Sequence, residues 1–189
     1  MNKQLPSPSD SELIDLTLGG QRDAFGELVK RYQNRLYNGL VQILRSEVEA
    51  EDAVQEAFIL ALTKLNTFKG TSQFFTWLYR IGYNVAVTRL RRRKPNVSMD
   101  GQSPDFQLQF PDDVPMPDAG IIERERANQL MKALDRMSDE HRSILVMREM
   151  DGMEYSTIAE VLDLPIGTVR SRLHRARLQL KELLESTMD

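Results

Sequence analysis

A proline-rich acidic segment near the middle of the chain limits the possible fold more than any other feature. Residues 96–120 contain four prolines, five aspartates and no lysine or arginine, and no sustained periodicity runs through them. Proline removes a backbone donor and ends regular elements, so this composition is typical of an extended linker. The 189-residue chain is therefore predicted to form two small domains, residues 1–95 and 121–189, each with a modest core.

Apolar residues recur at helical spacing in both predicted domains, which indicates an all-α fold. Ser9 followed by Glu12 has the pattern of a capping box and predicts a helix that ends at Gly19 and Gly20. Further helices are predicted over about 25–44, 48–65, 121–137 and 138–150, the last capped by Ser138. The residues expected to face inward are Phe25, Leu28, Val29, Tyr32, Leu36, Leu40, Val41, Leu44, Val54, Ala57, Phe58, Ala61, Leu62, Leu65, Ala127, Leu130, Met131, Leu134, Met137, Ile144 and Leu145.

Residues 152–184 have the layout of a helix-turn-helix. A short helical pattern reaches Leu162, the residues Asp163, Leu164 and Pro165 interrupt it, and a longer pattern begins near Gly167. The inward stripe of the second helix is predicted to be Val169, Leu173, Ala176, Leu180 and Leu183.

The opposite face of this second helix is the first candidate for nucleic-acid binding. Residues 166–178 contain no acid, and arginine on such a helix can reach guanine O6 and N7 or a phosphate in the major groove. Arg172 and Arg177 are expected at its flanks, and Leu178 is also expected to point outward. The predicted DNA contacts are Thr168, Arg170, Ser171, His174 and Arg175, with Thr168 placed to cap the helix or touch a phosphate. A helical hairpin with merely solvated arginines is the alternative.

The net charge of -3 conceals a strong segregation of charge along the chain. Residues 47–56 are acidic, whereas residues 66–94 carry seven lysines and arginines and no acid. Because charges are screened over roughly 8 to 10 Å, binding responds to the local potential more than to the total. Two basic patches in one chain predict two DNA contacts.

The second basic patch also contains a dense set of aromatic residues. Rings beside cations favour single-stranded nucleic acid, because unstacked bases lie on rings while cations hold the backbone. Trp77 has helical spacing with Leu78 and Ile81, however, so a core position is its alternative interpretation. Phe68, Phe74 and Tyr83 are the rings expected to be exposed.

Composition argues against several other functions. The sequence has no cysteine and two isolated histidines, which argues against disulfides, thiol chemistry and a zinc site. It offers no phosphate-binding loop and no nucleophile paired with a base, so we expect no enzyme, metal, cofactor or small-molecule substrate. The N-terminus lacks the apolar core of a signal peptide, and no run approaches the roughly 18 apolar residues of a membrane span. We therefore expect a soluble, cytoplasmic protein.

Three motifs in a fixed order resemble those of one protein family. They are DAVQEAF at 52–58, FKGTSQFFTWLYRIGYN at 68–84, and Gly152 together with LDLPIGTVRSRLHRAR at 162–177. The chain resembles the bacterial RNA polymerase sigma factors of the extracytoplasmic-function group of the sigma-70 family. The resemblance covers nearly all of the chain outside the first ten residues and the linker.

The resemblance implies a division of labour between the domains. Residues 1–95 would be the region 2-like domain that binds core RNA polymerase and the promoter -10 element, and residues 121–189 the region 4-like domain that binds the -35 element. Residues 96–120 would thread into the template and RNA-exit channels of the polymerase. The implied partners are the clamp of the largest polymerase subunit, the flap of the second subunit, promoter DNA and an anti-sigma factor.

The resemblance also assigns roles to individual residues. It makes Asp52, Gln55 and Glu56 contacts of the polymerase clamp, although acids near a helix N-terminus are also favoured by the helix dipole alone. The loop at 68–75 would hold a flipped base of the non-template strand, and the run at 89–94 would follow the DNA backbone. The residues implied at the -10 element are Phe68, Lys69, Thr71, Ser72, Phe75, Asn84, Arg91 and Arg92.

The chain departs from the family pattern at two places, and two other functions are compatible with parts of its sequence. The family often has Ser and Glu where this chain has Glu154 and Thr157, which predicts a weaker start of the first motif helix. His174 replaces an apolar or aromatic residue, which bears on the -35 preference. The other functions are an autonomous helix-turn-helix regulator and a sigma-mimicking protein that sequesters an anti-sigma factor, although such a mimic has no need of the DNA-facing arginines.

Overall fold

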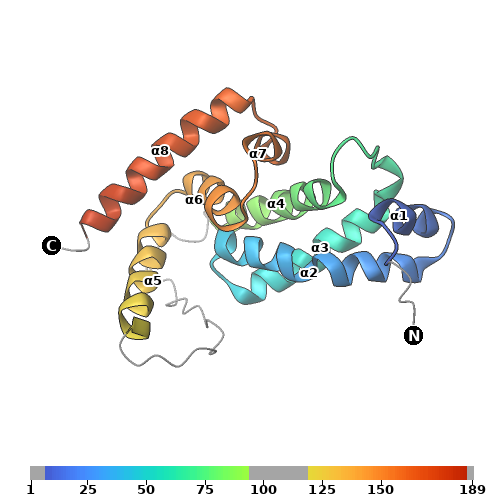
Figure 1. Cartoon of the computed structure of the whole chain (residues 1–189), viewed down its shortest axis with the longest axis horizontal. Helices are drawn as coiled ribbons and strands as arrows, with labels where there is room; N and C mark the ends of the chain where they lie inside the picture. The colour runs from blue at the N-terminus through green and yellow to red at the C-terminus, as the bar shows by residue number, and fades with distance from the viewer. Residues whose placement is uncertain (1–6, 94–118, 187–189) are drawn as a thin grey trace, which may run out of the picture. The chain divides into compact units, whose positions relative to one another are not determined.

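The computed structural model describes residues 7–93 and 119–186, and every regular element in these ranges is a helix (Figure 1). The all-α prediction is confirmed. The predicted linker lies outside the described residues except for Ala119 and Gly120, which begin a helix two residues earlier than expected. The chain divides into two compact units, one made mainly of residues up to Arg91 and the other mainly of the residues from Arg92 onward.

The first unit contains four α-helices and one short 3-10 turn. α1 and α3 both pack against α2, the longest of the described helices. The elements are α1 (Asp10–Leu18), α2 (Arg22–Leu44), α3 (Glu47–Thr63), η1 (Leu65–Thr67) and α4 (Phe74–Arg93).

The start of α1 has the capping box that the sequence predicts. The Ser9 hydroxyl accepts from the backbone N–H of Glu12, and the Glu12 carboxylate accepts from the backbone N–H of Ser9 at 2.7 Å. The hydrogen bond from the Ser9 backbone lowers the pKa of Glu12. Both orphan donors are thereby satisfied, which fixes where the helix begins.

The core of the first unit brings α2 and α4 into close approach at a glycine. A Cβ atom at Gly82 would lie 3.1 Å from Leu36 Cδ1 and 3.2 Å from Leu40 Cδ1. Both leucines are fully buried, so they have little room to move. Gly82 therefore allows the two helices to approach each other more closely than any larger residue would.

Most of the expected inward positions of the first unit are confirmed. The residues found buried are Phe25, Leu28, Leu36, Leu40, Val41, Leu44, Ala57, Phe58, Ala61 and Leu65. Val29, Tyr32 and Val54 are partly exposed. The prediction for Leu62 is wrong, because its side chain is 41% exposed on the outer face of α3.

The second unit consists of five helical segments in which α5 and α6 both pack against α8. Ser138 caps α6 by accepting from the backbone N–H of His141, as predicted. The helix predicted to reach residue 150 does so, but its last five residues form a π-helical segment. The elements are α5 (Ala119–Asp135), α6 (Asp139–Leu145), η3 (Val146–Met150), α7 (Tyr155–Leu162) and α8 (Ile166–Glu185).

A buried charge holds the corner between α5 and α6. The Arg142 side chain is 1% exposed, and its Nη1 donates to the Asp135 carboxylate at 2.6 Å. Leu134, Met137, Ile144 and Leu145 are buried as predicted. The inward prediction for Leu130 is wrong, since 38% of its side chain is exposed.

Candidate nucleic-acid and partner interfaces

The two faces of α8 have the polarity predicted from the sequence. Val169, Leu173 and Ala176 are buried, and Leu180 and Leu183 are partly buried. The side chains on the opposite face, all exposed, are those of Arg170, Ser171, His174, Arg175 and Leu178. The helix therefore presents an acid-free polar surface to solvent over about two turns.

The predicted capping role of Thr168 is wrong. Pro165 occupies the N-cap position, and the side chain of no residue caps this helix start. The backbone N–H of Thr168 donates to the Pro165 carbonyl at 2.8 Å, so Thr168 lies inside the first turn, half-buried. Its position in the first turn still places it near any phosphate bound at this helix start.

The turn between α7 and α8 is tight because of the backbone conformation of one residue and one backbone hydrogen bond. Asp163 adopts a left-handed conformation with φ 55°, and the backbone N–H of Leu164 donates to the Ala159 carbonyl at 3.0 Å. Glu154 is the N-cap of α7 and its side chain makes no capping hydrogen bond, in line with the weaker helix start predicted from the sequence.

The two flanking arginines of α8 are held by acids of the same unit. Arg172 pairs with Glu140 of α6, and Arg177 donates to the Glu149 carboxylate of η3 from Nη2 at 2.6 Å and from Nε at 3.0 Å. The hydrogen bond to Glu149 raises the pKa of Arg177. These pairs orient α8 and leave Arg170, which makes no ion pair within the described residues, free to meet a ligand.

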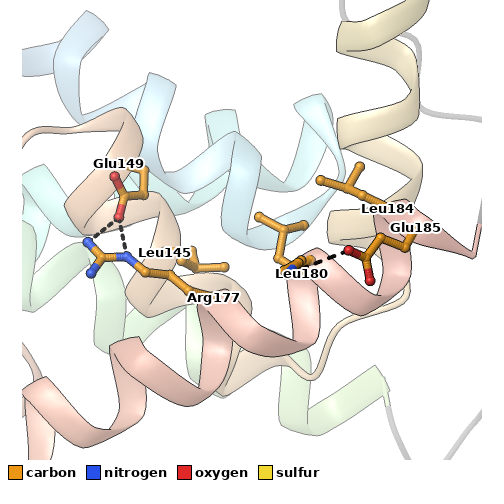
Figure 2. Close-up of a pocket in the computed structure, with 7 residues that line it drawn as sticks. Leu145, Glu149, Arg177, Leu180, Leu184 and Glu185 are labelled. Atoms are coloured by element: carbon orange, nitrogen blue, oxygen red, sulfur yellow. Dashed lines mark hydrogen bonds and ion pairs between the residues drawn. The ribbon is translucent and has the colours of Figure 1, made fainter.

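A shallow depression that the sequence did not predict lies beside the Arg177–Glu149 pair (Figure 2). Leu145, Leu180 and Leu184 form its apolar part. At its other end Lys181 pairs with Glu185 at 3.6 Å. The depression thus has an apolar part with an ion pair at each end, on a different part of α8 from the exposed basic face.

The loop before α4 combines exposed polar groups with a partly covered aromatic pair. Lys69 and Thr71 are exposed, Ser72 is half-buried, and Gly70 has φ +68°, which favours glycine. The ring centroids of Phe68 and Trp77 lie 5.3 Å apart, and both side chains are partly exposed.

The structure fits parts of both interpretations of Trp77, because its side chain packs against core residues and is still partly exposed. Its indole lies 5.8 Å from the ring of Phe74, which is 2% exposed. The predicted exposure of Phe74 is therefore wrong, whereas Phe68 and Tyr83 are partly exposed as expected. The prediction for Phe74 failed because this residue is the first of α4 and its side chain faces the core.

Phe75 does not fit the role of a base contact implied by the resemblance. Its side chain is 5% exposed, and its ring stacks against Tyr32 at 5.5 Å. The guanidinium of Arg35 lies 4.0 Å from the centroid of the same ring. Arg35, which sequence reasoning missed, is the cation that covers Phe75, an arrangement that cation–π attraction favours.

The exposed face of α4 carries three of the predicted DNA contacts. Asn84, Arg91 and Arg92 are exposed. Arg89 differs from them, because its Nη2 donates to Glu56 at 2.8 Å and its Nη1 lies 3.4 Å from Asp52. The expectation that Arg89 follows the DNA backbone therefore does not fit this structure, and Lys94 lies outside the described residues.

The outer face of α3 is more apolar than the sequence suggested. Asp52, Gln55 and Glu56 are exposed as expected. Three apolar side chains on the same helix are exposed as well, by 71% for Val48, 66% for Ile59 and 41% for Leu62. The spacing of residues 48, 52, 55, 59 and 62 places them in one stripe along the helix, with Asp52 and Gln55 between the apolar residues. Exposed apolar side chains grouped on one helix face are typical of a docking surface.

Residues 7–93 and 119–186 contain no group of three or more His, Asp or Glu side chains able to hold a metal ion. No helix in the same ranges is both long enough and apolar enough to cross a membrane.

Comparison with known protein families gives two matches that together span most of both units. The family model for sigma-70 region 2 matches residues 28–95. The family model for sigma-70, region 4, matches residues 127–180, which include α6, η3 and α7 and most of α8.

The chain is also similar over most of its length to curated bacterial proteins. It is 32% identical to the ECF RNA polymerase sigma factor SigW of Bacillus subtilis over 170 residues, covering 87% of this chain and 91% of that protein. It is 33% identical to the RNA polymerase sigma-H factor of Pseudomonas aeruginosa, with 96% of each chain covered. The ECF RNA polymerase sigma-E factor of Escherichia coli is 35% identical over 182 residues, with 94% of this chain and 93% of that protein covered.

Two solved structures share the fold. One is the structure of CnrH in complex with the cytosolic domain of CnrY, with a TM-score of 0.66, 26% identity and coverage of 92% of this chain and 96% of that chain. The other is the sigma factor RpoE in complex with the anti-sigma factor NepR from Bartonella quintana, with a TM-score of 0.68 and 25% identity. It covers 85% of this chain and 96% of that chain.

Proposed function

The chain belongs to the extracytoplasmic-function (ECF) group of RNA polymerase sigma factors, and from this premise we propose how its parts divide the work of promoter-specific transcription initiation. Residues 1–95 bind core polymerase and the -10 element, residues 121–189 bind the -35 element, and residues 96–120 connect them. The autonomous regulator is not favoured, because models of both sigma regions match the chain.

The observation that carries the proposal is the exposed, acid-free face of α8. Arg170, Ser171, His174 and Arg175 lie together on it, whereas Arg172 and Arg177 are engaged with Glu140 and Glu149. A helix with a free basic face and braced flanks suits insertion into the major groove at the -35 element. Thr168 is proposed to meet a phosphate from the first turn of the helix.

At the -10 element we assign different tasks to the loop and to α4. Lys69, Thr71 and Ser72 would hydrogen-bond a flipped base, and the partly exposed Phe68 offers its ring for stacking. Asn84, Arg91 and Arg92 would contact the same strand from α4. Phe75 supports the loop from below instead of touching the base, because its ring is covered by Arg35 and Tyr32.

The stripe on α3 is proposed to be the polymerase-binding surface. Asp52, Gln55 and Glu56 would meet basic and polar groups of the clamp of the largest subunit. The exposed apolar side chains of Val48, Ile59 and Leu62 extend this surface at both ends of the helix. Protein interfaces combine apolar contacts with hydrogen bonds, and this stripe offers side chains for both.

The remaining partners follow from the family. The flap of the second polymerase subunit is proposed to bind the second unit, and an anti-sigma factor is proposed to hold the chain inactive, since the RpoE relative was solved with one. We also propose that the chain has no catalytic activity of its own and acts in the cytoplasm, where core polymerase is found. Linked binding to polymerase and to two DNA elements would supply an affinity that either small DNA-binding unit lacks alone.

The deciding experiment is a pull-down of purified bacterial core RNA polymerase by the full-length chain, followed by transcription from a genomic fragment library. The control is the Asp52→Arg/Glu56→Arg double variant, which reverses the charge of the proposed clamp contact. We expect core binding that the control loses, and new start sites that share two spaced elements. No core binding together with specific retention of duplex DNA would contradict the proposal.

A further inference from the structure

We propose that Arg89 of α4 is a positioning residue of the polymerase-binding surface, a built-in counter-ion that a basic segment of the polymerase has to displace from Asp52 and Glu56. The inference rests on the role proposed above for these two carboxylates. Arg89 belongs to a different helix, in a stretch where every charged residue from 66 to 93 is basic. Its engagement with α3 is therefore a property of the fold that the sequence order does not show.

The geometry places one guanidinium across two carboxylates that are one helical turn apart. Nη2 of Arg89 lies 2.8 Å from Glu56 Oε2, and Nη1 lies 3.4 Å from Asp52 Oδ2. The side chain of Arg89 is only 26% exposed, whereas those of Asp52 and Glu56 are 58% and 50% exposed. The hydrogen bond to Glu56 also raises the pKa of Arg89. The cation is thus partly covered, while the carboxylates keep open acceptor positions toward solvent.

The charge that a partner meets is smaller than the sequence of α3 suggests. Asp52 and Glu56 together carry two negative charges, and Arg89 compensates one of them. Attraction between charged surfaces sets both the rate of encounter and part of the affinity, so this compensation weakens the pull on a basic partner. A partner arginine that approaches either carboxylate must share it with Arg89 or replace Arg89.

Such an exchange is feasible because both carboxylates are half exposed. Ion pairs at this level of exposure contribute little to stability, so they are readily traded for pairs with a partner. Arg89 is therefore expected to tune affinity moderately, and its removal is expected to strengthen polymerase binding instead of abolishing it. A residue that merely supported the fold would weaken binding when removed.

The test compares equilibrium binding of full-length variants to purified core RNA polymerase at low and high salt. Arg89→Gln removes the counter-ion, and Arg89→Lys retains the charge. Arg22→Gln removes an equal charge from the start of α2, where Arg22 forms no ion pair within the described residues. We expect Arg89→Gln to bind about three- to tenfold more tightly at low salt, with a smaller gain at high salt. Arg89→Lys should resemble the parent, and Arg22→Gln should change affinity less than Arg89→Gln does.

An unchanged or weaker affinity of a folded Arg89→Gln variant would overturn the inference. If this variant does not fold, Arg89→Met, which keeps the aliphatic length of the side chain, takes its place in the comparison. A double-mutant cycle then shows whether Arg89 acts through the two acids. In the Asp52→Asn/Glu56→Gln background, Arg89→Gln should have no effect, and a persistent gain would also overturn the inference.

The same cycle separates this inference from the proposed function. If Asp52→Asn/Glu56→Gln binds core polymerase as tightly as the parent does, the proposed polymerase contact itself is wrong, and the inference fails with it. If the acid variant loses affinity while Arg89→Gln in the parent gains none, only the inference about Arg89 is wrong.

Discussion

Nε and Nη2 of Arg177 both donate to the same oxygen of Glu149, which ties the middle of α8 to η3. We predict that Glu149→Gln destabilises the second unit by only about 0–1 kcal/mol, the usual range for exposed pairs. The released Arg177 cation should add about one phosphate contact. The slope of the logarithm of the DNA-binding constant against the logarithm of salt concentration should then steepen by about 1. Urea unfolding and DNA binding at several salt concentrations measure both effects. Glu185→Gln, which removes the Lys181 pair farther along α8, is the control, and an unchanged salt slope would contradict the prediction.

Because α2 and α4 approach each other closely at Gly82, we predict that even an alanine at this position destabilises the protein. Alanine is better than glycine in a helix by about 0.8–1.0 kcal/mol, and Gly26 in α2 has open space around it. Gly26→Ala should therefore stabilise the protein. Gly82→Ala places a methyl group against Leu36 and Leu40, and overpacking costs about 1–3 kcal/mol. We predict that Gly82→Ala is at least about 1 kcal/mol less stable than Gly26→Ala in thermal unfolding. Equal stabilities would mean that the two leucines move aside.

The hydroxyl of Tyr32 donates to Asp10, which joins α2 to α1. Burial and this hydrogen bond raise the pKa of Tyr32 to about 12. A tyrosine in an unfolded chain ionises near pH 10, so between about pH 10 and 12 the unfolded state loses this proton before the folded state does. The stability contributed by this contact should be fully present below about pH 10 and lost as the pH rises toward 12.

Urea unfolding at increasing pH, with tyrosinate absorbance followed in parallel, tests this prediction. Tyr32→Phe is the matched control, because it keeps the ring against Phe74 and Phe75 and removes the ionisable group. The stability of the variant should therefore decline less than that of the parent above about pH 10. A decline of the same size in the variant and the parent would show that Tyr32 is not its source.

Sequence patterns predicted the helices well because their signals are local. The capping box of Ser9 and Glu12, the cap at Ser138 and the inward stripe of α8 depend on residues a few positions apart. The outward face of α8 followed directly from that stripe, since helical geometry fixes one face once the other is known.

The errors come from contacts between residues that are distant in sequence. Leu62 has a suitable spacing for burial, yet none of the described helices covers its side chain. Arg89 appeared to belong to a DNA-facing run, but Asp52 and Glu56, more than thirty residues earlier, hold it. Arg35 covering Phe75 is a contact of the same kind. Periodicity along one helix does not show which of its faces another helix covers.

The exposed apolar side chains of α3 give a prediction that separates binding from stability. Ile59→Ser and Leu62→Ser change exposed positions, so each should alter the free energy of unfolding by no more than about 0.5 kcal/mol. If α3 is the polymerase-binding surface, each should weaken binding of core polymerase by about 1 kcal/mol or more. Leu18→Ser on α1, at a position that is also exposed, is the control and should bind like the parent. Normal core binding by both α3 variants would remove the apolar side chains from the interface.

Arg175 provides the sharpest test of the DNA-facing surface of α8. It is exposed on the same face as Arg170, and its side chain makes one hydrogen bond within the described residues, from Nε to the Ser171 carbonyl at 3.4 Å, so its removal should leave the fold intact. We predict that Arg175→Ala reduces binding at the preferred -35 element by about 1–3 kcal/mol and relaxes the preference at one base position.

Binding and transcription measured on a set of -35 variants distinguish this from a phosphate contact, whose loss would weaken all sequences equally. Arg172→Ala is the comparison, because Arg172 is already paired with Glu140 and should affect orientation more than base preference. Equal promoter strength for Arg175→Ala and the parent would exclude Arg175 from the site.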